Sequence, residues 1–136
     1  MERMFESCQS LISINFPNNF DTSNVNKMNG IFRNTNLNYY DINHFETHEM
    51  TDTQLMCSHC QNLVSLNLSN FNWGSINNME EMFSENNNLK LIDFGKTQIK
   101  EGVNVNNIFK NSNNKIIIYI NKIIPKIYSK RQTKIL

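Results

Sequence analysis

The sequence predicts an α/β solenoid of about five strand–turn–helix repeats, stacked so that their strands form a parallel sheet. Three observations support this prediction. A pattern of apolar residues recurs about every 26 positions, each copy combines a helical spacing with a strand-like alternation, and turn-forming residues separate the two. The repeats are expected to occupy residues 1–121, and a basic tail or cap is expected at residues 122–136.

The repeat is the strongest signal in the chain. Its anchor positions in the five copies are Met4, Ile31, Met56, Met82 and Ile108, with spacings of 27, 25, 26 and 26 residues. The second and fourth copies are degraded, and residues 98–103 lack the Asp-Thr-Ser segment that residues 21–23 provide in the first copy. A single copy cannot bury its apolar side, so copies are expected to stack and bury one continuous core.

A helix is predicted at the start of each copy. In the fourth copy Met79, Met82, Phe83 and Asn86 are spaced i, i+3, i+4 and i+7, which places them on one face of a helix. Polar residues at positions 21–24 and 74–75 precede the expected helices and are suited to cap them.

A strand is predicted after each helix. In the third copy Leu63, Leu66 and Leu68 end in the alternation of a strand with one buried face. Stacking is then expected to align equivalent residues in columns, which are Leu11, Leu63 and Leu89; Phe5, Phe32, Phe83 and Phe109; and Phe20, Phe45 and Phe71.

Charge divides the chain into two parts. Residues 1–110 carry 7 bases and 12 acids, a net charge of 7 − 12 = −5, and residues 111–136 carry 6 bases and no acid. The basic residues are Lys115, Lys122, Lys126, Lys130, Arg131 and Lys134. We interpret this tail as a solvated end, with nucleic acid or an anionic membrane as alternative partners. Pro125 is expected to limit strand pairing beyond it.

The sequence does not indicate a compartment. Residues 1–10 lack the apolar run of a signal peptide, and no stretch is long enough to form a membrane helix. Three cysteines, an odd number, do not form a disulfide framework.

Four residues have the chemistry of a zinc site. His44, His48, Cys57 and Cys60 are zinc-ligand types at local spacings close to those of zinc fingers, although their order is reversed. The repeat offers another explanation, because Cys60 occupies a small inward position and Cys57 occupies the position of the repeated phenylalanine. We therefore expect no metal, and we keep a zinc-stabilised domain as an alternative.

No catalytic machinery is expected. The chain has no glycine-rich phosphate loop, and its Ser and Asp residues lie in turns, where capping explains them. Glu80, Glu81 and Glu85 are expected on a solvated helix face rather than as paired catalytic carboxylates. Trp73 interrupts the pattern of its turn and is a candidate exposed anchor, although it can also fold onto a neighbouring turn.

Residues 1–120 resemble the BspA-type leucine-rich-repeat surface proteins. The resemblance is carried by Met1 to Val25, including the Phe20-Asp21-Thr22-Ser23 segment, and by Leu63 to Phe83. It implies a leucine-rich-repeat-like solenoid located at the cell surface or secreted, adhesive, and commonly part of a longer array.

The expected function is therefore a non-enzymatic protein-interaction or adhesion module. The partner is expected to be a protein, with a host or extracellular protein as the candidate, and no small-molecule substrate, cofactor or nucleic acid is expected. The chain is expected to be a monomer or part of a longer repeat array. Two alternatives are a zinc-stabilised domain whose basic tail binds nucleic acid, and a degenerate repeat fragment.

Overall fold

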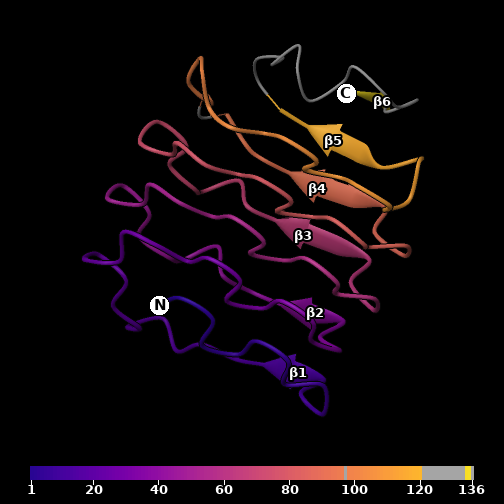
Figure 1. Ribbon diagram of the computed structural model, residues 1–136. Helices are drawn as coiled ribbons and strands as arrows, with labels where there is room; N and C mark the ends of the chain where they lie inside the picture. Colours follow the sequence, from indigo (N-terminus) through magenta and orange to yellow (C-terminus); the bar gives the residue numbers. More distant parts are fainter. Residues whose placement is uncertain (97, 121–133, 136) are drawn as a thin grey trace.

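The computed structural model describes residues 1–96, 98–120 and 134–135, in which the backbone winds into stacked coils (Figure 1). The strands are β1 (Ser13–Ile14), β2 (Tyr39–Tyr40), β3 (Ser65–Asn67), β4 (Leu91–Asp93), β5 (Ile117–Tyr119) and β6 (Lys134–Ile135). All pairings are parallel, in the orders β1-β2 and β3-β4-β5-β6. We number the coils 1 to 5 by their anchor residues, from Met4 to Ile108.

The prediction of strand–turn–helix repeats is wrong, because the described residues contain no helix. The segment 79–86, expected to be helical, instead runs through tight turns. The Met82 N–H donates to the Met79 carbonyl at 3.2 Å, and the Ser84 N–H donates to the Glu81 carbonyl at 3.1 Å. These bonds span three residues, whereas an α-helix requires four.

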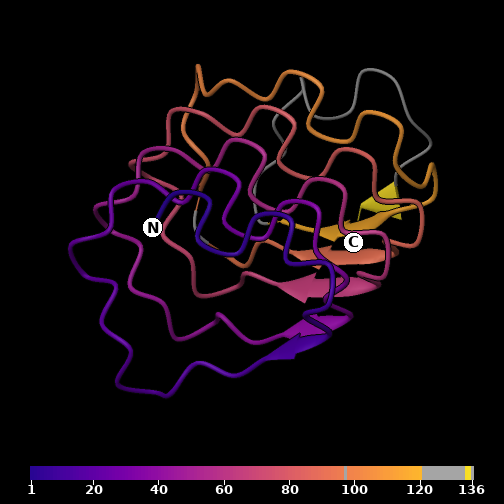
Figure 2. The same cartoon turned by 60° about the horizontal axis from the view of Figure 1, so that its bottom comes forward.

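The amides between these turns bond to the next coil. The Glu81 N–H donates to the Asn106 carbonyl at 3.0 Å, and the Phe83 N–H donates to the Ile108 carbonyl at 2.9 Å. We call residues 2–7, 29–34, 54–59, 80–85 and 106–111 the turn segments. Figure 2 shows these undulating segments running side by side, opposite the strands. Neighbouring coils are thus bonded through their turn segments and, except between β2 and β3, through their strands as well.

Left-handed backbone prevents the helix. Two residues with positive φ recur four positions apart in each turn segment, and in coil 4 these are Glu81 (φ 50°) and Glu85 (φ 60°). The equivalent residues are Arg3 and Ser7, Gly30 and Asn34, Leu55 and His59, and Asn107 and Asn111. A left-handed residue breaks an α-helix, and its cost is offset here by the bonds between coils.

The spacing of the coils explains why turns replace helices. Hydrogen-bonded strands lie about 4.8 Å apart, whereas packed helices need about 8–10 Å between their axes. A solenoid with helices on one side must therefore curve. Here the backbones of the turn segments hydrogen-bond to each other at the spacing of strands. The separation between coils is therefore the same on both sides of the stack, and the sheet is not forced into a concave arc.

The residues that are spaced as on one face of a helix are nevertheless the buried ones. Met79, Met82, Phe83 and Asn86 are all fully buried, although on turns rather than on a helix. The exception to the anchor pattern is Met4, which is 50% exposed, while the other four anchors are buried. Coil 1 therefore presents to solvent an apolar position that the inner coils bury.

At one repeated position, occupied by Thr35, Cys60, Asn86 and Ser112 in coils 2 to 5, a polar side chain or a thiol closes the turn segment; the first three are buried and Ser112 is partly exposed. In coil 4 the Asn86 Nδ2 donates to the carbonyls of Cys57 at 2.7 Å and Phe83 at 3.0 Å, and its Oδ1 accepts from the Cys60 N–H at 2.7 Å. Thr35 and Ser112 use their hydroxyls at the equivalent positions to reach carbonyls. This column therefore satisfies backbone groups that would otherwise be buried without partners.

The expected helix caps instead form local turns and contacts between coils. The Asp21 Oδ1 accepts from the Ser23 N–H at 2.9 Å, which is a bond within a turn. Thr22 is buried, and its Oγ1 donates to the Glu46 carbonyl at 3.1 Å and accepts from the Glu46 N–H at 2.8 Å.

Most of the basic tail lies outside the described residues, including Lys122, Pro125, Lys126, Lys130 and Arg131. Beyond Pro125, however, β6 pairs with β5 in parallel. The expectation that Pro125 limits strand pairing is therefore not met at residues 134–135. Nothing in the described residues forms a helix long and apolar enough to cross a membrane.

Candidate functional site

Exposed apolar side chains gather on one face of the molecule. Of the five large hydrophobic residues that are exposed among the described residues, four lie on or beside the strands: Ile12 (67%), Tyr39 (65%), Val64 (44%) and Tyr119 (39%). Met4 is the fifth and lies at the end of the stack. Single exposed apolar residues are ordinary, whereas a group on one surface marks a candidate interaction site.

Strand alternation positions the part of this surface that lies on the strands. In β3, Leu66 faces the core while Ser65 and Asn67 face solvent, and Val64 precedes them on the outside. The parallel register aligns equivalent residues, so that Ser13 pairs with Tyr39, and Asp93 pairs with Tyr119. We call the outward residues of β1 to β5, together with Ile12, Asn38, Val64 and Lys90, the sheet face.

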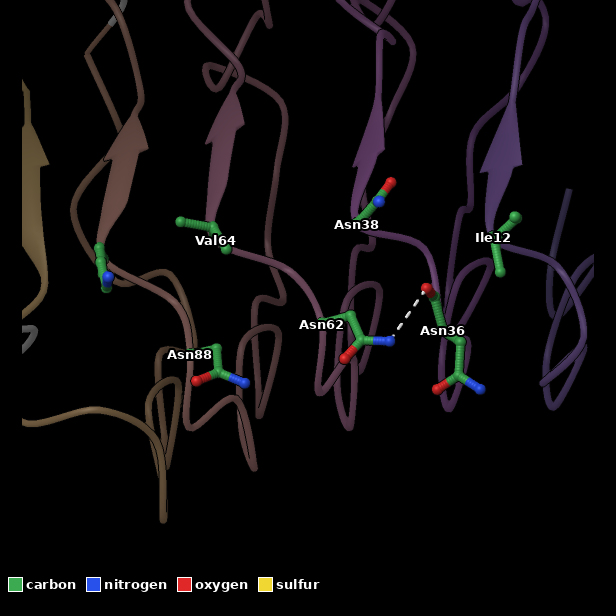
Figure 3. Close-up of a pocket in the computed structure, with 7 residues that line it drawn as sticks. Ile12, Asn36, Asn38, Asn62, Val64 and Asn88 are labelled. Carbon is green, nitrogen blue, oxygen red and sulfur yellow. Dashed lines mark hydrogen bonds between the residues drawn. The ribbon is translucent and has the colours of Figure 1, made fainter.

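A shallow groove of about 490 Å³ crosses one side of the sheet face. Figure 3 shows Ile12, Asn38 and Val64 at the bases of three neighbouring strands, above Asn36, Asn62 and Asn88. The side-chain amide of Asn62 donates to the Asn36 carbonyl at 3.4 Å, and that of Asn88 donates to the Gln61 carbonyl at 2.8 Å. The groove thus presents two apolar residues beside amides that are held between coils.

Polar residues on the opposite side of the sheet face stabilise the backbone. The Asp41 Oδ1 accepts from the Asn43 N–H at 2.9 Å, the Asn67 Oδ1 from the Ser69 N–H at 2.9 Å, and the Asp93 Oδ1 from the Gly95 N–H at 2.8 Å. These bonds form the turns that follow the strands. The carboxylates are therefore explained by structure and are not arranged as a catalytic pair.

The candidate zinc ligands each have other contacts. Cys57 and Cys60 are fully buried; the Tyr40 hydroxyl donates to the Cys57 Sγ at 3.1 Å, and the Cys60 Sγ donates to the Phe32 carbonyl at 3.1 Å. The His44 ring packs edge-on against a phenylalanine, and the exposed His48 faces Glu49 at 3.9 Å. Within the described residues, no three His, Cys, Asp or Glu residues are grouped to hold a metal ion.

Burial sets the chemistry of these thiols. Burial raises the pKa of Cys60 to about 11, with hydrogen bonds from Thr35 opposing the rise. Burial, together with the nearby Cys60, raises the pKa of Cys57 well above its ordinary value. Because the thiolate is the reactive form, both buried cysteines are poor nucleophiles at neutral pH.

We expect only Cys8 to react with a disulfide reagent in the folded protein at neutral pH, because Cys8 is exposed and the other two thiols are buried. All three are expected to react after denaturation, and Cys8→Ser should leave no reactive thiol in the native state. In the unfolded chain the cysteine thiols have a pKa of about 8.5, so the two buried thiols stay protonated to higher pH in the folded protein. Stability should therefore fall as the pH rises from about 8.5 to the Cys60 pKa of about 11. A second fast-reacting native thiol would contradict this assignment.

Trp73 is a core residue rather than an exposed anchor. Its side chain is fully buried, its Nε1 donates to the Phe94 carbonyl at 2.9 Å, and its ring lies 5.0 Å from the Phe94 ring.

The acidic residues Glu80, Glu81 and Glu85 each contact a neighbouring coil. Glu80 contacts Gln54 and Asn104, Glu81 contacts Lys110, and Glu85 contacts Asn111.

One nucleophile–base contact was missed in the sequence. The Ser58 Oγ lies 2.7 Å from the His59 Nδ1 and 2.8 Å from the Ser84 Oγ, although the two residues Ser58 and His59 are adjacent in the chain. Both serines are fully buried, so neither hydroxyl is accessible to a substrate. We interpret these bonds as contacts that hold coils 3 and 4 together.

The sheet-face residues were also missed, because Ile12, Tyr39 and Val64 occupy variable positions of the repeat. Strand alternation directs only Tyr39 outward; Ile12 and Val64 lie just before their strands, at the parity of the inward residues Ile14 and Leu66.

The comparison with protein families identifies the chain. A family model described as "Mycoplasma protein of unknown function, DUF285" matches residues 1–119 of the 136. The chain belongs to the DUF285 family. The stacked coils therefore represent the fold of nearly the whole matched DUF285 region. No curated protein and no solved structure is similar enough to match this chain.

This assignment corrects the family resemblance inferred from the sequence. The matching family is DUF285, and no leucine-rich-repeat or BspA-type model matches the chain. The absence of helices in the described residues also removes the structural basis for a leucine-rich-repeat solenoid. The surface location and the adhesive role were implied only by that resemblance, so they lose their support with it.

Proposed function

We propose that this DUF285 chain is a non-enzymatic protein-interaction module that binds a protein partner through the sheet face. The main support is that, in the part of the chain that the structure describes, four of the five exposed large hydrophobic residues lie on this surface. Burying apolar surface contributes about 25 cal/mol per Å², so these side chains would supply most of the binding energy. Tyrosines are frequent in the energetic centres of protein interfaces, and Tyr39 and Tyr119 are candidates for this role.

The surroundings of these residues suit a protein partner. Val64 and Ile12 lie in a shallow groove beside Asn62 and Asn88, whose amides are oriented by bonds to the backbone. Apolar residues surrounded by polar groups of fixed orientation resemble the core and rim of a protein interface. The surface is broad and shallow, whereas sites for small molecules are concave and enclose their ligand.

A surface variant tests the proposal. Ile12→Ser, Tyr39→Ser and Val64→Ser should be combined in one chain, and a control should carry Asn24→Ser, Asn87→Ser and Glu101→Ser, at exposed positions away from the strands. Proteins captured from a lysate of the source cells are then quantified for each tagged chain. We expect a specific partner to be retained by the wild type and the control, and to be reduced about tenfold or more by the sheet-face variant. Equal capture by both variants would contradict the proposal.

A further inference from the structure

The groove on the sheet face runs across the strands, from coil 1 to coil 4. One side of it is a row of residues 26 positions apart, which we call the upper row: Ile12, Asn38, Val64 and Lys90. The upper row is exposed in coils 2 to 4 as well as in coil 1, so its exposure belongs to the repeated position and not to the end of the stack. The groove also crosses the interval between β2 and β3, which are not paired with each other.

The spacing of the two apolar residues in the upper row limits the conformation of an occupant. Ile12 and Val64 lie two coils apart, and coils stacked at the spacing of strands place them about 10 Å from each other. An extended strand brings side chains to the same face about every 7 Å. A polyproline II helix does so after three residues, or about every 9 Å. The groove therefore fits polyproline II better than an extended strand.

The direction of the groove leads to the same conformation. Figure 3 shows Ile12, Asn38 and Val64 at the bases of three neighbouring strands, so a chain lying along this row runs across the strands. It cannot form a ladder with any of them, and an occupant that needs partners for all its N–H groups would leave many unpaired. A proline-rich polyproline II segment has no ladder to form, and its prolines have no N–H to satisfy.

The other side of the groove supplies oriented amides. The Nδ2 groups of Asn36, Asn62 and Asn88 donate to backbone carbonyls of the preceding coil at 2.6, 3.4 and 2.8 Å. Figure 3 shows their side-chain oxygens on the opposite side, and each Nδ2 has a second N–H. The carbonyls of a polyproline II segment are free to accept from such groups. An α-helix satisfies its own backbone and would leave these amides unused.

An aromatic side chain stands beside the groove. Tyr39 follows Asn38 in the chain, is exposed, and pairs with Ser13 on β1, while Ser65 holds the equivalent position on β3. Because both neighbours are small, the Tyr39 ring has room on either side for a proline ring to pack against it. Grooves that recognise polyproline II segments are lined by aromatic residues in the same way.

Charge distinguishes the two ends of the groove. Lys90 is exposed at the coil 4 end, and the Ile117 N–H donates to its carbonyl at 2.8 Å, so the exposed Lys115 lies on the adjacent coil. Neither lysine forms an ion pair with a described residue. The carboxylates of Asp41 and Asp93 lie on the opposite side of the sheet face. An acidic residue in the occupant is therefore attracted to the coil 4 end of the groove.

We propose that the groove binds a proline-rich segment of the protein partner in the polyproline II conformation. Two apolar residues of the segment, three positions apart, pack over Ile12 and Val64, and an acidic residue beyond the second of them pairs with Lys90. This occupant rests on the proposed function, because it is the part of the partner that the sheet face would hold. Its preformed conformation keeps the entropy lost on binding small.

The test is fluorescence anisotropy of the full chain with a labelled peptide. In the peptide, prolines surround two leucines three positions apart, and two glutamates follow. A matched peptide has alanine in place of every proline, which favours a helix and frees the backbone. We expect saturable binding of the proline peptide, weakened by salt, and binding of the alanine peptide that is weaker by about tenfold or more. Absence of binding by the proline peptide, or equal binding of both, would overturn the proposal.

Charge reversal shows where the acidic end lies. Lys90→Glu should weaken binding of the proline peptide by about tenfold or more, and should restore binding when lysines replace the glutamates of the peptide. Lys100→Glu is the matched control, because it makes the same charge change at an exposed position away from the strands, and it should bind as the wild type does. Equal effects of the two substitutions would contradict the assigned orientation.

The peptide and the captured partner test different claims. A partner that is lost with the sheet-face variant, while the proline peptide does not bind, would overturn the polyproline II occupant and leave the proposed function standing. Peptide binding together with capture that the sheet-face variant does not change would support the groove and contradict the proposed function.

Discussion

Gly95→Ala is expected to destabilise the chain by about 2–5 kcal/mol, combining the cost of a left-handed backbone with that of steric overlap. Gly95 has a φ of 71°, and a Cβ there would lie 2.1 Å from the Ser69 carbonyl oxygen and 2.7 Å from the Ser69 Cα. These are backbone atoms of the neighbouring coil, so a side-chain rotation cannot relieve the contact. Urea denaturation followed by the fluorescence of the buried Trp73 measures the loss.

Gly102→Ala is the matched control for this substitution. Gly102 has a φ of 81°, but a Cβ there would meet nothing within 4 Å. This variant should therefore lose only about 1–2 kcal/mol, the cost of placing an L-residue in left-handed backbone. The difference between the two variants isolates the close approach of coils 3 and 4. Equal losses at both glycines would show that the Ser69 contact relaxes without cost.

Phe83→Ala is expected to cost about 3–5 kcal/mol, the range found when a large aromatic side chain is removed from a core. Phe83 is fully buried, stacks on Phe109 with ring centroids 5.6 Å apart, and meets Phe94 edge-on at 6.0 Å. Removing the ring therefore leaves a cavity between coils 4 and 5 as well as exposing apolar surface. The free energy of unfolding from urea titration is the appropriate measurement.

Phe5→Ala provides the comparison, because Phe5 holds the equivalent position in coil 1. Phe5 is only partly buried and stacks on Phe32 at 5.9 Å on one side, with no described coil on the other. We expect its removal to cost less than half as much as that of Phe83. Equal losses of stability for the two substitutions would contradict the expectation that an inner-coil phenylalanine stabilises the fold more than its equivalent in an end coil.

The repeat period and the buried residues could be predicted from the sequence, but the backbone of the turn segments could not. Residues at i, i+3, i+4 and i+7 face inward on a helix, and Met79, Met82, Phe83 and Asn86 show that tight turns achieve the same burial. Hydrophobic periodicity reports which residues are buried, not which atoms the backbone amides bond to. The available signal was the abundance of Asn, which tolerates left-handed backbone and occupies such positions at Asn34, Asn107 and Asn111.

The strands and the candidate site also combine features that the sequence predicts with features that it does not. The alternation of Leu63, Leu66 and Leu68 correctly predicted the inward residues around β3. The outward residues Ile12, Tyr39 and Val64 could not be singled out, because the repeat does not fix the residue type at their positions. The position of Ile12 and Val64 is taken by Asn38 and Lys90 in coils 2 and 4. Trp73 was ambiguous for another reason: its burial depends on Phe94, which lies in the following coil.

The bonds between coils have a consequence for how this protein must fold. In the turn segments, every second amide finds its acceptor about 25 residues away, as Phe32 does with Met56 and Phe83 does with Ile108. A single 26-residue unit, cut out as a peptide, would lack most of these acceptors and would have no helix to form by itself. The smallest piece in which these amides meet their acceptors is thus a pair of adjacent units, so we expect folding to begin with such a pair and to extend by the addition of neighbouring units.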